Sequence, residues 1–337
     1  MKTHHITTLI RGIILIVAGS AILYSFLTWV VAQRLQAVGS EMNWLSAGAG
    51  VIFLFTAALL AEKFFALKSL PYTDWLYKVR PSGTLTFPLR TIIVQLGIFT
   101  LLGAIIGAAT GSIILYALLG LLCRAGVGLL KKTTIPTLLN AGTKNLLSYA
   151  ALMVLDSTTV NQGITAAHLT WRDQTPTSNY LLISLRRLFR QRHLLLSMLV
   201  ILSLTIALSQ ALMPQAAVLF FFLWNTLSGN IASLGDFTQL GAPETTKYPI
   251  LVIYALLGAV HLVIVTHPGS ILIAGLLVMI STLWAGIIRS RSRQVTKVTF
   301  IDSGFGVIFS PKLFRYYLAG LFPTSIIAMV YATVMLT

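Results

Sequence analysis

Long stretches without an ionised side chain constrain the fold of this chain more than any other feature. Such stretches are Gly12–Ala32, Met42–Ala61, Thr91–Leu130 (interrupted only by Arg124), Leu194–Gly235, Tyr248–Ile288 and Tyr316–Thr337. A helix of about 20 apolar residues crosses the hydrocarbon core of a bilayer. In lipid, backbone amides find hydrogen-bond partners only inside helices or closed barrels. The sequence therefore predicts an all-α fold, a polytopic transmembrane helix bundle.

The three longest stretches predict hairpins of two spans each, because each is about twice the length that one span needs. Turn-forming residues lie near their middles, at Thr110-Gly111-Ser112, at Pro214 and at His267-Pro268-Gly269. Gly12–Ala32 exceeds the apolar core of a cleavable signal peptide, about 7–15 residues, so we expect a retained first helix. With Tyr316–Thr337 as a terminal helix, the prediction is a bundle of about eight to nine spans.

The charged residues predict how the bundle is oriented. The chain has 24 Lys and Arg against 8 Asp and Glu, a formal net charge of +16. With the N-terminus in the cytoplasm, every Lys and Arg except Arg34 falls on the cytoplasmic side, as the positive-inside rule requires. We therefore expect a multi-pass protein of the cytoplasmic membrane whose basic loops contact anionic lipid headgroups. This placement argues against nucleic acid as a partner.

Three regions follow from this layout. Residues 1–130 form an N-terminal transmembrane region of two hairpins, and residues 131–193 form a cytoplasmic or interfacial connecting region. Residues 194–337 form a C-terminal transmembrane region of two hairpins and a terminal helix. In the connecting region, Asn145–Leu155 is apolar with helical periodicity but too short to span. We expect an interfacial or re-entrant helix there, because a crossing would move the later arginines outside.

Gly103, Gly107 and Gly111 are spaced four residues apart in a predicted span. Small residues at this spacing let a neighbouring helix approach closely. We interpret them as helix-packing positions within the bundle. The alternative is an interface with a second chain, which would make a homo- or heterodimer, or a contact that moves.

Leu181–His193 is predicted to be a basic amphipathic helix that runs into the next span. Leu181, Leu185 and Leu188 share one face, whereas Arg186 and Arg190 share another. Two interpretations stay open for the arginines: an anchor to lipid headgroups, or a docking surface for a cytoplasmic partner. Arginine suits docking because its planar guanidinium pairs with carboxylates.

Asp156 and His261 are the candidates for a polar site near the membrane. Asp156 precedes Ser157 and caps a helix junction or pairs with an arginine of the basic helix. His261 lies within a span, where a hydrogen-bonded structural role competes with proton transfer or acyl chemistry. His267 follows six residues later with no Cys or Glu at ligand spacing, so we expect no metal site.

Several catalytic motifs are missing from the sequence. It contains no GxxxxGK[ST] phosphate-binding loop and no HExxH, GxSxG or CxxC motif. We therefore expect neither ATP hydrolysis by this chain alone nor a bound cofactor.

From about Lys131 to Tyr317, the order of several short segments resembles a poorly characterised family of actinobacterial membrane proteins. That family is related to permease subunits of ATP-binding-cassette (ABC) exporters. The segments are Leu155-Asp156-Ser157, Trp171-Arg172, Leu185–Arg190, Arg289–Arg293, Ser303–Val307 and Pro311.

The resemblance implies a permease-like subunit that acts as a dimer with a separate cytoplasmic ATPase, which agrees with the missing nucleotide motif. It also places the coupling interface at Arg172, Arg186, Arg187 and Arg190. Nine spans would exceed the six that are common in such exporters. The alternatives are a membrane-embedded enzyme acting on lipid or polyprenyl substrates through His261 or Asp156, and a non-catalytic assembly subunit held through the three glycines.

Overall fold

The computed structural model describes residues 44–68, 89–129, 179–209, 213–237, 242–265, 271–292, 301–302, 308–309 and 324–331. Three predicted segments lie wholly or mostly outside these residues: the first span at Gly12–Ala32, the segment Asn145–Leu155, and the terminal helix at Tyr316–Thr337.

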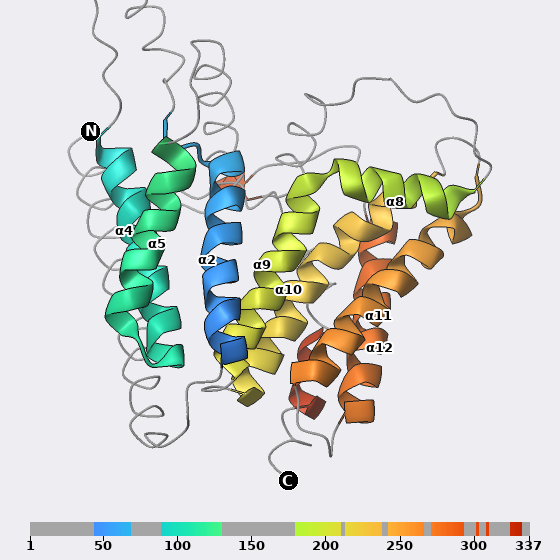
Figure 1. Ribbon diagram of the computed structural model, residues 1–337. Coiled ribbons are helices and arrows are strands. Elements are labelled where there is room, and N and C mark those ends of the chain that lie inside the picture. Colours follow the sequence, from blue (N-terminus) through green and yellow to red (C-terminus); the bar gives the residue numbers. More distant parts are fainter. Residues whose placement is uncertain are drawn as a thin grey trace, which may run out of the picture.

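The described chain is almost entirely α-helical (Figure 1). Its elements are α2 (Trp44–Phe64), α4 (Leu89–Thr110), α5 (Ile113–Leu129), α8 (Tyr180–Arg190), α9 (Arg192–Ser209), α10 (Met213–Leu234), the 3-10 helix η2 (Glu244–Lys247), α11 (Tyr248–Val265) and α12 (Ile271–Ser292). Residues 324–331 are also helical. The sequence did not predict two short strands, β1 (Ile301–Asp302) and β2 (Ile308–Phe309), which pair antiparallel.

Among the described residues, six helices are long and apolar enough to cross a membrane, which makes this a multi-pass membrane protein. They are α2, α4, α9, α10, η2 with α11, and α12. Helix α5 is also apolar but shorter. The total of eight to nine spans and the orientation stay predictions.

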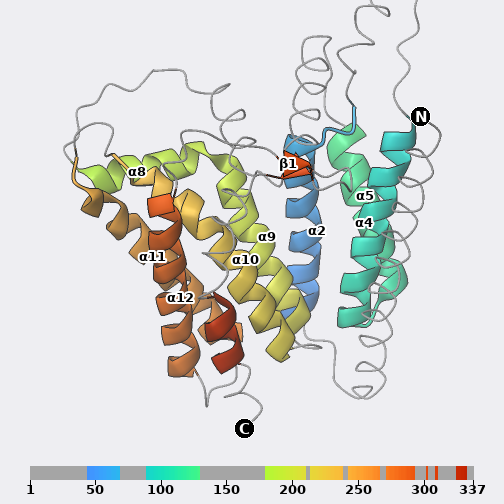
Figure 2. The same ribbon diagram turned by 180° about the vertical axis from the view of Figure 1, so that it is seen from behind.

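Two apolar cores hold the helices together. Side chains of α2, α4, α5, α9 and the first turns of α10 form one core, which includes Phe53, Leu54 and Tyr116. The other core lies among α8 to α12 and the helical segment 324–331, and it contains Phe220 and Trp224. Helices α2 and α9 lie side by side in both views and join the two groups (Figures 1 and 2).

The end of α2, the start of α9 and the end of α12 lie at one end of the bundle, the upper end in Figure 1, and each carries a basic residue. Lys63 lies in the last turn of α2, Arg192 begins α9, and Arg289 lies near the end of α12. Helix α8 lies across this same end. The turn between α4 and α5 is at the opposite end, where Gly111 has φ 93°, as the Thr110-Gly111-Ser112 signal predicted.

Candidate functional site

Helix α8 is a separate helix with defined ends. Asn179 caps its start, since the side-chain Oδ1 accepts hydrogen bonds from the backbone N–H of Leu181 (3.1 Å) and of Leu182 (3.3 Å). At its end, Gln191 leaves the helical conformation with φ −83° and ψ 64°. This helix leads into the next span, as predicted, but its predicted continuation to His193 is wrong, because Gln191 redirects the chain and α9 begins anew at Arg192.

The apolar face of α8 packs on the protein. Leu188 belongs to the core among α8 to α12, and Leu181 and Leu185 pack against that core. These are the residues that the sequence placed on one face. Because the bundle covers this apolar face of α8, the face does not contact the bilayer.

Arg187 fastens α8 to the end of α10. Its Nη1 donates a hydrogen bond to the carbonyl of Leu234, the last residue of α10, over 3.2 Å. Its guanidinium lies 4.3 Å from the ring centroid of Phe237, a cation–π distance. Burial lowers the pKa of Arg187, and the nearby carboxylate of Asp236 partly opposes that shift. A cation at a helix C-terminus also meets the negative end of the helix dipole.

The outward face of α8 combines charge with apolar surface. Arg186 and Arg190 are exposed there, and Phe189 between them is 66% exposed. Leu182 extends the same face one turn earlier. The structure thus distinguishes the three arginines of α8 that belong to the predicted interface, because Arg187 contacts Leu234 and Phe237 whereas Arg186 and Arg190 are exposed.

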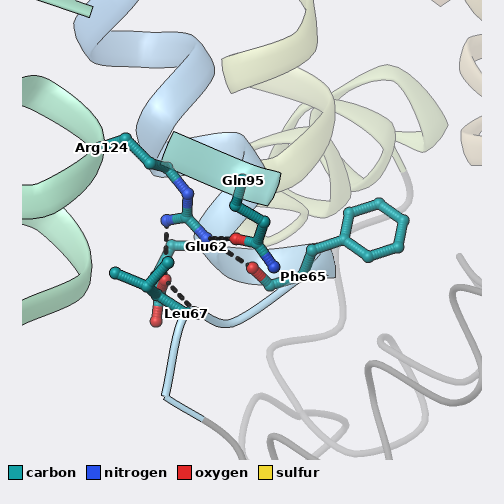
Figure 3. A network of polar contacts seen from close by, with 5 residues as sticks. All are labelled: Glu62, Phe65, Leu67, Gln95 and Arg124. Carbon is teal, nitrogen blue, oxygen red and sulfur yellow. Dashed lines mark hydrogen bonds and ion pairs between the residues drawn. The ribbon is translucent and has the colours of Figure 1, made fainter. Parts of the chain in front are cut away.

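A buried ion pair joins α2 to α5 (Figure 3). Arg124 is fully buried, and its Nη1 lies 2.8 Å from Oε2 of Glu62. The same guanidinium donates to the carbonyl of Phe65 and to Oε1 of Gln95 on α4. Glu62 Oε2 also accepts the backbone N–H of Leu67 over 3.0 Å.

The sequence prediction did not include this ion pair. The available signal was Arg124 itself, the single charge in the stretch Thr91–Leu130. A charge inside a span needs a partner, and Glu62 directly follows the preceding uncharged stretch.

A second buried polar cluster surrounds Asn225 in the middle of α10. Its Nδ2 donates to the hydroxyls of Ser281 (3.2 Å) and Thr324 (3.1 Å), which links α10 to α12 and to the helical segment 324–331. Arg289 of α12 donates to the backbone carbonyl of Asn225. The exposed fraction of each of these residues is 1% or less. The cluster therefore ties three segments together inside the bundle.

His261 of α11 contacts Thr205 of α9. Its Nε2 lies 2.6 Å from Oγ1 of Thr205, and its ring centroid lies 4.9 Å from that of Phe220. Both His261 and Thr205 are buried. Within the described residues no group of His, Cys, Asp and Glu is arranged to hold a metal ion.

The three glycines occupy two kinds of position. A Cβ at Gly103 would lie 2.0 Å from the carbonyl oxygen of Tyr116, and one at Gly107 would lie 2.6 Å from Cα of Ile113. Both residues are therefore where α4 and α5 of the same chain touch. Gly111 lies in the connecting turn. Gly120 of α5 completes the contact, since its Cβ would lie 2.2 Å from the carbonyl oxygen of Phe99.

Asp156 and Arg172 lie outside the described residues. The comparisons with family models, with curated proteins and with solved structures found no match for the chain. What the structure itself establishes is a membrane protein with several transmembrane helices.

Proposed function

We propose that the chain is a permease-like transmembrane subunit of an ATP-driven, ABC-type exporter, and that α8 docks a separate cytoplasmic ATPase. The observation that supports this most is the division of α8 into two faces. One face packs on the bundle, whereas the other presents Arg186, Phe189 and Arg190. Arginine and aromatic side chains are enriched among the residues that dominate protein–protein binding energy.

The packing of α8 favours a protein partner over a lipid anchor. An amphipathic helix that binds the bilayer surface buries its apolar face among the acyl chains. Here Leu181, Leu185 and Leu188 contact the protein instead. An acidic surface of a cytoplasmic protein would complement the exposed side chains of Arg186 and Arg190.

The contacts of Arg187 supply a route for coupling. A partner that moves α8 also moves the end of α10, because Arg187 binds Leu234 and stacks on Phe237. Helix α10 continues to the Asn225 cluster, which joins it to α12. ATP-driven closure of the partner would thereby shift the helices of the C-terminal region between two packings.

The alternatives receive less support from the geometry. For a membrane-embedded enzyme, His261 would need an acid–base or nucleophilic partner, and its hydrogen bond within the described residues is to the hydroxyl of Thr205. For an assembly subunit held through glycines, Gly103 and Gly107 would need to face another chain, yet both touch α5.

Copurification tests the proposal. Tagged full-length protein would be extracted from native membranes in mild detergent, and ATPase polypeptides would be quantified by mass spectrometry. We expect an ATPase with the wild type and at least about tenfold less with Arg186→Glu/Arg190→Glu, because truncating a dominant interface residue weakens binding by that order. The matched variant Arg186→Lys/Arg190→Lys keeps the charge and should retain most of the ATPase. No ATPase with the wild type, or full recovery with the Glu variant, would contradict the proposal.

A further inference from the structure

A groove of about 970 Å³ lies between α2, α5 and α9. Its walls are apolar and include Phe55, Leu59, Leu122 and Leu199. Three of these side chains are also strongly exposed, namely Phe55 (49%), Leu122 (61%) and Leu199 (46%). On helices that cross a membrane, exposed apolar side chains face lipid, so the groove opens sideways into the bilayer.

The groove has cations at one end. Lys63 in the last turn of α2 and Arg192 at the start of α9 both line it. Glu62 lines it too, but its Oε2 binds Arg124 and the backbone N–H of Leu67. These residues belong to the end of the bundle that collects the basic residues, where lipid headgroups lie if the helices span the membrane.

The length of the groove matches one bilayer leaflet. Lys63 is eight positions after Phe55 in α2, a rise of about 12 Å at 1.5 Å per residue. The hydrocarbon of one leaflet is about 15 Å thick. An amphiphile with a charged head at Lys63 would therefore extend its chain along the apolar walls to nearly the middle of the membrane.

We propose that this groove binds one anionic phospholipid taken from the surrounding bilayer. The phosphate lies between Lys63 and Arg192, and an acyl chain lies along Phe55, Leu59 and Leu199. The charges at the headgroup end are complementary to a phosphate, and the apolar walls are complementary to a hydrocarbon chain. This inference is independent of the ATPase proposal, because it concerns a different surface and its test uses no nucleotide.

Cys123 provides the probe, since it is the one cysteine of the chain and lines the groove. Purified full-length protein in neutral detergent would be titrated with phosphatidylglycerol, and the rate of modification by N-ethylmaleimide would be measured. We expect phosphatidylglycerol to slow the modification at mole fractions where phosphatidylcholine does not. Glycerol 3-phosphate alone should not protect, because it lacks the acyl chains.

Lys63→Gln/Arg192→Gln should raise by about 30-fold the phosphatidylglycerol fraction at which Cys123 modification is half-slowed. Each basic residue usually contributes a similar amount to the free energy of binding an anionic lipid, and the variant removes two of them. In the charge-preserving variant Lys63→Arg/Arg192→Lys, phosphatidylglycerol should protect Cys123 as it does in the wild type. That result would show that substitution at these helix ends leaves the groove intact. Arg186→Gln/Arg190→Gln, which removes two charges outside the groove, should also leave protection unchanged.

Three results would overturn the proposal. They are equal protection by both lipids, unchanged half-protection in Lys63→Gln/Arg192→Gln, and equal loss of protection in Arg186→Gln/Arg190→Gln.

Discussion

Replacing Arg124 by Gln tests whether the buried ion pair stabilises the packing of α2, α4 and α5. Arg124 is 0% exposed, and Glu62 is 8% exposed. The replacement leaves the Glu62 carboxylate without its cation. It also removes the donors to the carbonyl of Phe65 and to Gln95.

The magnitude follows from the geometry. At 2.8 Å, two unit charges attract by about 6 kcal/mol in an effective dielectric of about 20. Desolvation offsets much of this attraction in the intact pair, whereas removing one partner costs about 3–5 kcal/mol because a buried charge is left alone. We therefore expect Arg124→Gln to lower the free energy of unfolding by about 3–5 kcal/mol. Glu62→Gln should cost about as much, about 3–5 kcal/mol, because Arg124 is fully buried and keeps its charge when the carboxylate is lost.

A double-mutant cycle measures the interaction directly. Glu62→Gln, Arg124→Gln and the double variant would be unfolded in mixed micelles by increasing fractions of a denaturing detergent, with helicity followed by circular dichroism. The double variant should be more stable than the sum of the two single effects predicts, with a coupling energy of about 2 kcal/mol. A coupling energy below about 0.5 kcal/mol would refute the reasoning, since additivity holds within that limit for independent sites.

The pair Lys247–Glu244 offers the matched control. Its charged atoms are 3.4 Å apart; Lys247 is 5% exposed, but Glu244 is 62% exposed. Water solvates the exposed carboxylate and screens the pair, which should contribute about 0–1 kcal/mol, so Glu244→Gln should shift the unfolding midpoint much less than Glu62→Gln. A loss as large as that of Glu62→Gln would mean that burial does not set the difference between the two pairs.

Three further predictions concern helix contacts, each measured as the unfolding midpoint in the same micelles. Gly103→Ala should lower the free energy of unfolding by about 2 kcal/mol or more, as overpacking in a core does, because the new Cβ would lie 2.0 Å from a backbone carbonyl oxygen. Gly97→Ala is the control: its Cβ would have no atom within 4 Å, so this change should be neutral or stabilising. Tyr116→Phe should cost about 1 kcal/mol, because its hydroxyl donates to the α2 backbone over 2.8 Å. Thr205→Val should cost about 1–3 kcal/mol by leaving His261 without its partner. Equal effects of the two glycine variants, or no effect of the other two changes, would contradict these contacts.

The glycines show how far local sequence predicts a contact. The spacing of Gly103 and Gly107 predicted a close approach of helices, and the structure has both at the contact with α5. The partner could not be derived from spacing, because a small-residue face fits any helix. Gly111 belongs to the turn, as the separate signal at Thr110-Gly111-Ser112 predicted.

The arginines of α8 show where prediction from sequence ended. Periodicity separated the leucine face from the face of Arg186 and Arg190. It could not assign Arg187, because that residue acts through Leu234 and Phe237, which follow about 50 positions later in the chain. The break at Gln191 was also hidden, since glutamine is an ordinary helix former.

The sequence by itself determined that the chain forms apolar helices, that several are long enough to span a membrane, and that basic residues lie together at helix ends. These properties follow from hydrocarbon thickness and from the cost of charge in lipid, which act on each segment separately. Only the tertiary structure decided that Arg124 pairs with Glu62, that α8 lies across the bundle, and that Lys63 and Arg192 line one groove. Such pairings depend on which helices become neighbours, and side-chain packing between helices distant in sequence decides that.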